Sequence, residues 1–570
     1  MKCTGARIVI ECLLEQGVKV VFGYPGGAIL NIYDELYKNK DRITHILTAH
    51  EQGAAHAADG YSRSTGKTGV VMATSGPGAT NLVTGIATAY MDSSPLVAIT
   101  CNVATSLLGK DSFQEIDITG ITMPITKHNY IVRDVDTLAD TIREAFMIAE
   151  TGRPGPVLID IPKDVTAAVT EYTPPVVNFA SEGPVQLARA SIRRVTHIQS
   201  PTDDDIRRVA ALINSSERPF LYVGGGVVID SAWDELKELA EKRNIPVATS
   251  LMGKSAFPAN HPLACGMIGM HGTKAANTGA NRSDLIIALG ARFSDRVISD
   301  SSKFASKSTI LQIDIDSAEI NKNIVTDDCL VGSIKETLRR LLPLVGPRSR
   351  SEWNSQIEEW KTHIPAMYTK KTKLHPKFAL EYVYKKLGDK GILVTEVGQH
   401  QMWAAQFYPF SQPRSFITSG GLGTMGFGTG AAIGAQLANP GKKVVHFAGD
   451  GSFRMNSTEL ATIFHYQIPI IILVINNGTL GMVRQWQKLF YDKRYSETTL
   501  DFGPDFVKLA EAYGIAGYRV STEEEFTVAF DKAVELNKPV LIDCGMNIDE
   551  MVFPMVPAGK PIDELLLDLD

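Results

Sequence analysis

Short apolar runs alternate with longer stretches of helical periodicity along most of the chain. Short, continuously apolar runs between helical segments are typical of parallel strands that are buried on both faces of a sheet. The runs that we interpret as strands are Val18–Phe22, Ile43–Ala49, Thr68–Ala73, Leu96–Thr100, Val157–Ile161, Phe220–Val223, Leu285–Leu289, Ile310–Ile315, Val444–Ala448 and Ile470–Ile475. The alternation predicts an α/β protein with three doubly wound parallel-sheet domains.

Polar stretches divide this pattern into blocks. The first domain is predicted at residues 1–165, the second at 190–345 and the third at 370–550. A tail at 551–570, which contains prolines and then acidic residues, could become ordered only when a site closes over it.

Two linkers separate the predicted domains. The first contains Pro174-Pro175 and runs to about residue 205. The second, at about 346–376, carries Trp353 and Trp360 at helical spacing. We interpret these tryptophans as packing residues rather than as part of a site.

Composition narrows the class of protein. The chain has 570 residues, 44% of them hydrophobic, and a net charge of −6, which argues against a nucleic-acid-binding surface. The six cysteines form no CxxC pair, as expected in a reducing compartment without structural zinc. No apolar run approaches the roughly 20 residues that span a bilayer, and no signal-peptide pattern precedes the first amphipathic segment. We therefore expect a cytoplasmic protein without a membrane segment.

Polar residues follow two of the predicted strands at the point where each strand ends. Val444–Ala448 leads into Gly449-Asp450-Gly451, and Ile470–Ile475 leads into Asn476-Asn477. A capping-box pattern at Asn456–Glu459 predicts a helix between them that reaches His465 or Tyr466, which makes a β-α-β unit with parallel strands.

In such a unit Asp450 and Asn477 leave the sheet at the same edge, where ligands usually bind. Their oxygens suit Mg²⁺, which commonly completes its octahedron with phosphate and water. Gly449 and Gly451 would let a diphosphate approach the main chain. The alternative is two buried strands with ordinary polar turns.

Gly-Asp-Gly followed after twenty-four residues by Asn-Asn resembles the signature of thiamine-diphosphate enzymes. Ala49–Gly60 and Thr74–Asn81 resemble the pyrimidine-binding domain of the same family. The resemblance implies the fold of that family, with Mg²⁺ held by Asp450, Asn477 and the carbonyl of Thr479. It also implies that Glu51 hydrogen-bonds the aminopyrimidine of a cofactor held by another subunit, so that the protein is at least a homodimer, or a tetramer.

The implied thiamine-diphosphate contacts extend beyond these motifs. They are Pro25, Glu51, Val397, Gly398, Gln399, His400, Gly423, Met425, Gly449, Asp450, Gly451, Ser452, Asn477, Thr479, Leu480, Gly481 and Met482.

Within this family the chain is most similar to the catalytic large subunits of acetolactate synthases. The similarity is carried by Phe22–Gly27, Asp111–Glu115, Gly269–Asn277 and Leu480–Trp486. Such enzymes decarboxylate pyruvate and add the hydroxyethyl group to a second 2-keto acid. The products are 2-acetolactate and 2-aceto-2-hydroxybutyrate, in valine, leucine and isoleucine biosynthesis.

The resemblance also implies residues for the second 2-keto acid. Arg296 matches the position that binds its carboxylate. Trp486 matches the tryptophan that walls the second-substrate pocket and favours the extra methyl group of 2-ketobutyrate. Met482, four residues earlier, shares its helical face, although such a stripe is more often ordinary core. One methylene is worth about 1–3 kcal/mol of discrimination. Phe113, Gln114 and Lys163 match further active-site positions.

The second domain resembles a flavin domain, which implies FAD in a structural, non-redox role. The matching positions are Arg153, Gly224, Gly225, Gly226, Ser250, Leu251, Met270, His271, Gly272, Thr273, Lys274, Gly290, Ala291, Arg292, Asp314 and Ile315. Three departures from the family pattern stand out: Ser294 and Ser333 replace aspartates, and Cys101-Asn102 replaces Gly-Gln.

Other functions compete with this interpretation. A flavin-independent acetolactate synthase would lack the Arg-Phe-x-Asp-Arg stretch and Trp486, which are both present. A pyruvate oxidase or another 2-keto-acid decarboxylase of the same fold, and a non-catalytic cofactor-binding paralogue, stay open. A separate regulatory small subunit is a further expected partner.

Overall fold

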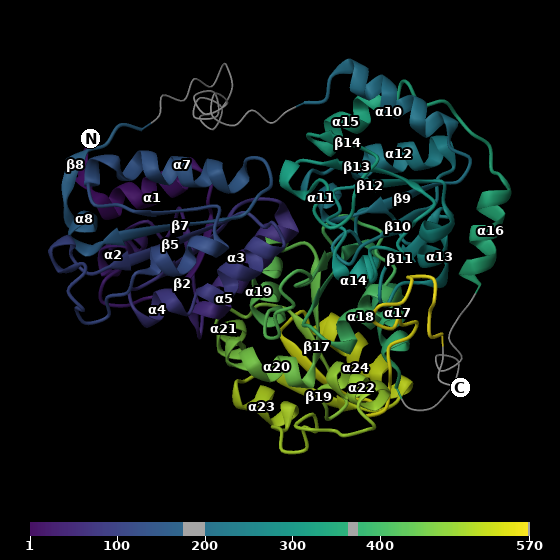
Figure 1. Ribbon diagram of the computed structural model, residues 1–570. Coiled ribbons are helices and arrows are strands. Elements are labelled where there is room, and N and C mark those ends of the chain that lie inside the picture. The colour runs from purple at the N-terminus through teal and green to yellow at the C-terminus, as the bar shows by residue number, and fades with distance from the viewer. Residues whose placement is uncertain (175–199, 363–373, 568–570) are drawn as a thin grey trace.

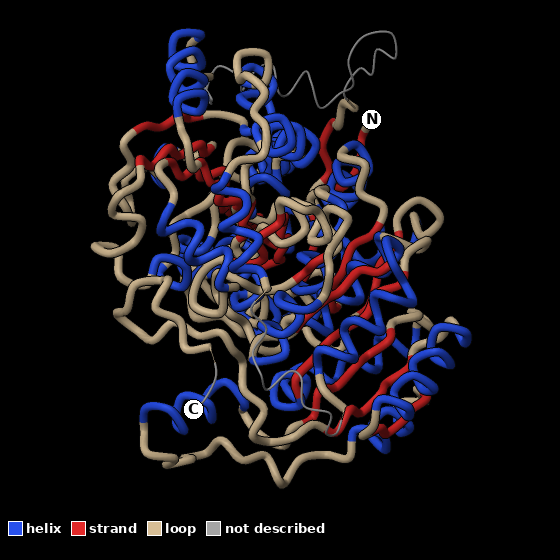
Figure 2. Tube along the Cα trace, turned by 90° about the vertical axis from the view of Figure 1, so that its right-hand side faces the viewer, coloured by secondary structure: helices blue, strands red, loops and turns tan. Residues whose placement is uncertain are grey.

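Three sheets, each of six parallel strands, form the framework of the protein in a computed structural model that describes residues 1–174, 200–362 and 374–567 (Figure 1). Helices cover both faces of the sheets, and in the view turned by 90° the red strands lie between blue helices (Figure 2). The predicted fold class is confirmed. The predicted strands match those of the structure within about two residues.

The N-terminal sheet has the strand order β3-β2-β4-β5-β7-β6. Its strands are β2 (Val20–Tyr24), β3 (Thr44–Leu47), β4 (Gly69–Ala73), β5 (Leu96–Asn102), β6 (His128–Ile131) and β7 (Pro156–Pro162). Its helices are α1 (Gly5–Glu15), α2 (Leu30–Lys38), α3 (Glu51–Thr65), α4 (Pro77–Thr80), α5 (Val83–Met91), α6 (Ile118–Thr122), α7 (Leu138–Glu150) and α8 (Lys163–Ala167). Because β8 (Val169–Glu171) pairs antiparallel with β1 (Lys2–Thr4), this domain continues past residue 165.

The central sheet has the order β11-β10-β9-β12-β13-β14. Its strands are β9 (Pro219–Val223), β10 (Val247–Thr249), β11 (Ala264–Met267), β12 (Leu285–Leu289), β13 (Thr309–Asp314) and β14 (Asp328–Val331). Its helices are α10 (Asp203–Ser215), α11 (Gly225–Ile229), α12 (Trp233–Arg243), α13 (Lys274–Arg282), α14 (Asp295–Ile298) and α15 (Ile334–Leu341).

The predicted linkers have different outcomes. Most of the first, residues 175–199, lies outside the described residues, as does 363–373 of the second. The remainder of the second contains α16 (Glu352–Lys361), which packs against the central domain: the Trp353 indole N–H donates to the Pro219 carbonyl at 3.1 Å, and Trp360 meets Trp353 edge to face. Both tryptophans are packing residues, as predicted.

The C-terminal sheet has the order β16-β15-β17-β18-β20-β19. Its strands are β15 (Gly391–Thr395), β16 (Phe416–Ile417), β17 (Lys443–Gly449), β18 (Ile471–Asn476), β19 (Ala516–Val520) and β20 (Val540–Gly545). Its helices are α17 (Pro376–Leu387), α18 (Gln399–Phe407), α19 (Gly428–Ala438), α20 (Asp450–Phe453), α21 (Leu460–His465), α22 (Gly481–Phe490), α23 (Phe506–Ala512) and α24 (Glu523–Leu536).

The capping box predicted at Asn456–Glu459 is wrong. These residues lie in a 3-10 segment, η7 (Arg454–Glu459), and the helical path between the strands already begins at Asp450. Asn456 instead donates to the Gly426 carbonyl, and Glu459 accepts main-chain N–H groups of the N-terminal domain. Tertiary contacts therefore use the side chains that could have capped a helix, although the helix does end at His465 as predicted.

Helices α3 and α19 join the N-terminal and C-terminal domains at a very close crossing, visible near the centre of Figure 1. A Cβ atom at Gly60 would lie 2.1 Å from the Ala431 carbonyl oxygen, and one at Gly434 would lie 1.8 Å from that of Ala57. Glycine and alanine thus let the two helix backbones touch. Arg63 of α3 adds a buried ion pair to Asp92 at 2.9 Å and stacks on Phe427 of the C-terminal domain.

The tail after residue 550 is ordered without any closure of a site, contrary to the prediction. Its residues Met551, Phe553, Met555 and Ile562 are buried. Apolar side chains of the tail fill the space between the central and C-terminal domains, which explains its order in the single chain. None of the helices in the three described ranges is long and apolar enough to cross a membrane.

Candidate active site

The metal motif lies where it was predicted, at the carboxyl ends of two neighbouring strands. Strands β17 and β18 are parallel, with Gly449 opposite Ile475, so Asp450 and Asn477 follow adjacent strand ends. The main-chain N–H of Gly478 donates to the Asn476 side-chain oxygen at 3.3 Å, and the Asn477 side-chain oxygen accepts the N–H of Thr479 at 3.2 Å. One tight turn therefore brings these groups together.

Asp450 has the properties of a cation ligand. Its side chain is buried, and burial raises its pKa to about 6. In the described part of the chain, no lysine or arginine forms an ion pair with it, although the charge of Arg454 acts on it from a greater distance, and no cluster of three His, Cys, Asp or Glu side chains could hold a metal alone. A carboxylate without a cationic partner, next to amide and carbonyl oxygens, fits a hard cation such as Mg²⁺.

Glu396 supports the same edge of the sheet and was missed in the sequence. It follows β15, is fully buried, and accepts hydrogen bonds from the main-chain N–H groups of Gly426 (2.7 Å) and Gly428 (2.9 Å) and from Ser452 (3.2 Å). Its carboxylate thus holds the glycine-rich loop that carries Met425. An acidic residue directly after an apolar strand was the available signal.

Glu51 is the first residue of α3. His50 caps this helix by accepting the N–H of Gln52 at 3.1 Å, and the Asn81 side chain donates to one Glu51 carboxylate oxygen at 2.9 Å. The second predicted motif of the N-terminal domain, Thr74–Asn81, therefore orients Glu51. Its carboxylate lies at the N-terminal end of the helix, which carries a partial positive charge.

A second buried carboxylate, Glu459, fixes the chain just before Glu51. Its two oxygens accept the main-chain N–H groups of Ala49 (3.1 Å) and His50 (3.0 Å). A Cβ at Gly53 would lie 2.0 Å from the same carboxylate, so only glycine fits there. The segment after Asp450 thus reaches across the domain boundary and positions the start of α3.

Three other predicted residues of the N-terminal domain, Phe113, Lys163 and Pro25, face outward. Phe113 is 87% exposed, and Lys163 and Pro25 are exposed as well. Gln114 has a positive φ of 60°, and its main chain lies so close to Gly76 that a Cβ there would be 2.9 Å from its carbonyl oxygen. The loop therefore exposes Phe113 on the surface of the single chain and leaves Gln114 half-buried against Gly76.

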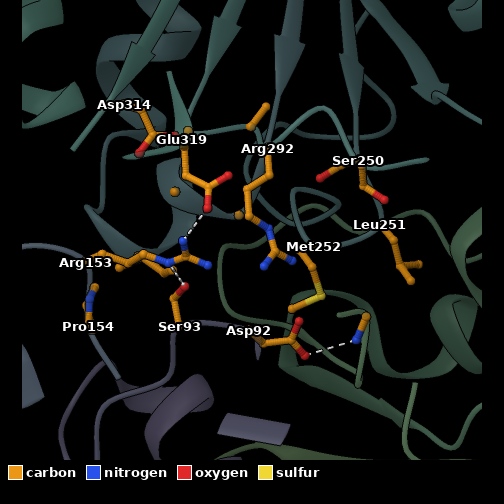
Figure 3. Close-up of a pocket in the computed structure, with 18 of the residues that line it drawn as sticks. Asp92, Ser93, Arg153, Pro154, Ser250, Leu251, Met252, Arg292, Asp314 and Glu319 are labelled. Atoms are coloured by element: carbon orange, nitrogen blue, oxygen red, sulfur yellow. Dashed lines mark hydrogen bonds and ion pairs between the residues drawn. The ribbon is translucent and has the colours of Figure 1, made fainter. Parts of the chain in front are cut away.

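A cavity of about 1110 Å³ opens between all three domains (Figure 3). Asp92, Ser93 and Arg153 line it from the N-terminal domain, the strand ends of the central sheet line it from above, and Val397, Gly398, Gly423 and Met482 line it from the C-terminal domain. Glu51 and Asp450 are not among its lining residues. Asp92, which the sequence did not single out, accepts the N–H groups of Gly420 (3.0 Å) and Gly421 (2.7 Å) and joins two of the domains.

Two arginines of the cavity differ in their partners. Arg153 donates to Ser93 and forms ion pairs with Glu319 at 2.6 Å and Asp316 at 3.2 Å. Arg292 donates to the Met91 carbonyl at 2.6 Å and has no carboxylate partner among the residues described. The Arg292 guanidinium therefore leaves a positive charge available to an anionic ligand.

One end of the cavity holds the residues predicted for the second substrate. Arg296, Met482 and Trp486 all line it, and the Arg296 guanidinium lies 6.0 Å from the centre of the Trp486 ring. Met482 and Trp486 share one face of α22, as their spacing predicted. A cation and an apolar wall thus meet in one place, which suits an anion with a short apolar chain.

Comparison with known proteins agrees with this architecture. The thiamine pyrophosphate enzyme families match in three parts: the N-terminal TPP binding domain at residues 3–121, the central domain at 206–341 and the C-terminal TPP binding domain at 396–544. A probable acetolactate synthase large subunit of Methanocaldococcus jannaschii is 48% identical, covering 99% of this chain and 95% of that protein. An acetolactate synthase of Mycobacterium bovis is 46% identical (99% and 91%), and the acetolactate synthase isozyme 3 large subunit of Escherichia coli is 42% identical (99% and 98%).

The chain belongs to the acetolactate synthase family of thiamine-pyrophosphate enzymes. The predicted family, fold class and thiamine-diphosphate cofactor are thereby confirmed. The roles of individual residues, Mg²⁺ and FAD stay predictions.

Most positions that the acetolactate synthase resemblance assigned to FAD line the cavity. They are Arg153, Gly224, Gly225, Gly226, Ser250, Leu251, Met270, His271, Gly290, Ala291, Arg292, Asp314 and Ile315. Gly272, Thr273 and Lys274 are not among the lining residues; Thr273 caps α13 by accepting the N–H of Ala276. Burial raises the pKa of Asp314 to about 6. A buried acceptor at one strand end, and at another a guanidinium with no carboxylate partner among the described residues, fit the hydroxyl groups and the diphosphate of a dinucleotide.

The departures from the family pattern have local structural roles. Ser294 caps α14 by accepting the N–H of Arg296, and Ser333 caps α15 by accepting that of Glu336, both at 3.2 Å. Asn102 donates to the buried Asp160 carboxylate at 2.8 Å and to the Ile116 carbonyl at 3.3 Å. Asn102 thus fastens the base of the loop that carries Phe113 and Gln114.

Proposed function

We propose that this protein decarboxylates pyruvate and joins the resulting two-carbon unit to a second 2-keto acid, yielding 2-acetolactate or 2-aceto-2-hydroxybutyrate. The observation that carries the proposal is the meeting of Arg296, Met482 and Trp486 in the lining of the cavity. A simple decarboxylase has no acceptor substrate, so it has no need for a cation that binds an acceptor's carboxylate next to an apolar wall.

Different residues would hold the cofactor and transfer the proton. Bound thiamine diphosphate supplies the carbanion chemistry. Asp450, Asn477 and the Thr479 carbonyl would hold Mg²⁺ on its diphosphate. Glu51 would exchange a proton with its pyrimidine ring, because an acid held by a helix end and by Asn81 keeps a defined orientation.

The acceptor end selects the second substrate. The Arg296 side chain, 63% exposed in the single chain, binds the carboxylate of either 2-keto acid. The Trp486 ring and Met482 contact the methyl group that distinguishes 2-ketobutyrate from pyruvate. The cation thus contributes to both products, and the apolar wall contributes to one of them.

FAD would fill the rest of the cavity in a structural role. Arg292 would pair with the diphosphate of FAD, and Asp314 would accept hydroxyl groups of its ribose. A pyruvate oxidase would use the same flavin to pass electrons to an acceptor, and this difference can be measured.

A second copy of the chain would complete each active site. Phe113, Lys163 and Pro25 are exposed although they match active-site positions, and Glu51 does not line the cavity that contains Trp486. A homodimer in which the N-terminal domain of one chain covers the C-terminal domain of the other accounts for both observations. Because two of the relatives are named large subunits, we also propose a separate small subunit as a partner.

The test uses the purified full chain with pyruvate, thiamine diphosphate, Mg²⁺ and FAD, and it quantifies acetolactate directly. We expect acetolactate formation without any electron acceptor. Acetate as the main product, with flavin reduction that an electron acceptor reverses, would show an oxidase instead. Acetaldehyde as the main product without flavin reduction would show a simple decarboxylase. Absence of turnover with cofactor bound would indicate a non-catalytic paralogue.

A further inference from the structure

One end of the cavity lies beyond Asp314, at the carboxyl end of β14. We call it the acidic end because Asp230 and Asp314 line it. Ser333 follows this strand region and caps α15, and it shares the cavity lining with Asp230, which ends α11. The Ser333 hydroxyl donates to the Oδ2 atom of Asp230 at 2.9 Å, and the main-chain N–H of Lys335 donates to the same atom at 2.8 Å. Two donors from one helix start therefore hold the Asp230 carboxylate in a fixed orientation.

The charge of Asp230 is not neutralised by a neighbouring cation. The Lys335 ammonium donates to the Ser231 carbonyl at 2.8 Å and faces Glu235 at 3.8 Å, and Arg339 also pairs with Glu235, at 2.9 Å. Within the described ranges, Asp230 takes part in no ion pair and its Oδ1 atom has no hydrogen-bond donor. An oriented carboxylate oxygen on a cavity wall is thus left to accept a bond from a ligand.

The order of strands across the sheet indicates which part of a dinucleotide would reach this oxygen. Glycines follow β9 and β12 in the middle of the sheet, Asp314 ends β13, and Ser333 follows β14 at the sheet edge. The guanidinium of Arg292, which has no carboxylate partner among the described residues, belongs to the middle and suits a diphosphate, whereas a diphosphate would be repelled by Asp230 and Asp314. Groups that donate hydrogen bonds, such as a purine amine or a ribose hydroxyl, fit the acidic end.

We propose that Asp230, oriented by Ser333 and by the Lys335 N–H, is an FAD-binding residue that accepts a hydrogen bond from the adenosine half of the cofactor. The proposal rests on the proposed flavin site. It also explains how this chain tolerates a serine at position 333: the carboxylate that the family usually places on the helix cap is supplied by a neighbouring segment.

The experiment measures flavin affinity, not activity. Flavin-free full-length protein is titrated with FAD and with FMN, which lacks the adenosine half, and binding is followed by the change in flavin fluorescence. Asp230→Asn should raise the dissociation constant for FAD about tenfold, because it weakens a hydrogen bond to a charged acceptor, and leave that for FMN unchanged. Ser333→Ala keeps the Lys335 N–H bond to Asp230 and should weaken FAD binding less.

The double variant with Asp230→Asn and Ser333→Asp returns a carboxylate to the same place and should regain most of the FAD affinity. Unchanged FAD affinity in Asp230→Asn overturns the proposal. An equal loss of affinity for FAD and for FMN also overturns it. The same holds if the flavin-free variant melts at a temperature low enough to explain its weaker FAD binding, because either result shows that Asp230 only supports α15. Wild-type protein that binds neither flavin would refute the proposed flavin site itself, and this inference with it.

Discussion

Replacement of Glu459 by glutamine tests how the C-terminal domain controls the position of Glu51. In the structure both Glu459 oxygens accept main-chain N–H groups, from Ala49 and His50, and one oxygen also accepts the Thr462 hydroxyl at 2.6 Å. Glutamine has the same shape but only one acceptor oxygen. Its amide nitrogen would face an N–H group, and one buried donor would lose its partner.

The expected loss can be bounded from these contacts. A buried N–H without an acceptor costs about 1–3 kcal/mol, and a neutral acceptor is weaker than a charged one. In the opposite direction, burial raises the pKa of Glu459, so its ionised form carries a desolvation cost that glutamine avoids. We therefore expect a net loss of about 1–3 kcal/mol in the free energy of unfolding and not the sum of all three bonds.

Catalysis should respond more strongly than stability. The two lost contacts lie immediately before Glu51, and misplacement of a catalytic group by about 1 Å can cost roughly 100-fold in rate. We expect kcat to fall by about 10- to 100-fold with little change in KM for pyruvate, because the cavity and Arg296 are untouched.

The assay pairs steady-state kinetics with thermal unfolding. Thr462→Val is the matched control, since it removes the hydroxyl bond to Glu459 and leaves both main-chain N–H bonds in place; its kcat should stay near that of the wild type. A Glu459→Gln variant with unchanged melting temperature and kcat would refute the reasoning, and so would an equal loss in Thr462→Val.

Four further predictions concern single residues. Glu51→Gln should bind thiamine diphosphate normally but lose roughly 10²–10⁴-fold in kcat, as expected for a positioned proton-transfer group, and near-normal acetolactate formation at saturating cofactor would contradict its role. Asp450→Ala should raise the dissociation constant for thiamine diphosphate and be partly rescued by high cofactor and Mg²⁺; equal cofactor binding in titrations would refute the metal site. Trp486→Leu should lower the ratio of 2-aceto-2-hydroxybutyrate to 2-acetolactate in mixtures of both substrates, whereas Arg296→Ala should reduce both products, and an unchanged ratio would make Trp486 ordinary core. Burial lowers the pKa of His56 from 6.5 to about 4, so the unfolded chain binds this proton first as the pH falls, and stability is lost between those two pH values. His56→Gln should therefore lose roughly 3 kcal/mol less free energy of unfolding than the wild type between pH 7 and pH 4, as measured by denaturant unfolding. The same pH dependence in both proteins would contradict the prediction.

The sequence alone determined the framework of the fold and the place of the metal motif. Parallel strands buried on both faces appear as continuous apolar runs, and Val444–Ala448 and Ile470–Ile475 were therefore recognisable without structural information. The carboxyl ends of neighbouring parallel strands meet at one edge, so the position of Asp450 relative to Asn477 followed from chain order. The spacing of Met482 and Trp486 likewise determined that they share one face of a helix.

The roles of several buried carboxylates were decided by tertiary structure only. Glu459 has the spacing of a helix-capping residue, yet it binds main-chain groups of Ala49 and His50, more than 400 residues earlier in the chain. Glu396 holds a glycine loop, and Asp230 meets a helix start about 100 residues away. A local pattern shows which side chains are polar, but it carries no information on which distant donor will satisfy them.

The large cavity and the tail depend on the same long-range packing. Each domain contributes only part of the cavity wall, and Met551, Phe553 and Met555 are buried because two domains meet over them. Periodicity is fixed by the geometry of one helix or strand, and so it can be read from the sequence. A space between three domains depends on how their surfaces fit together, and only the folded chain determines that fit.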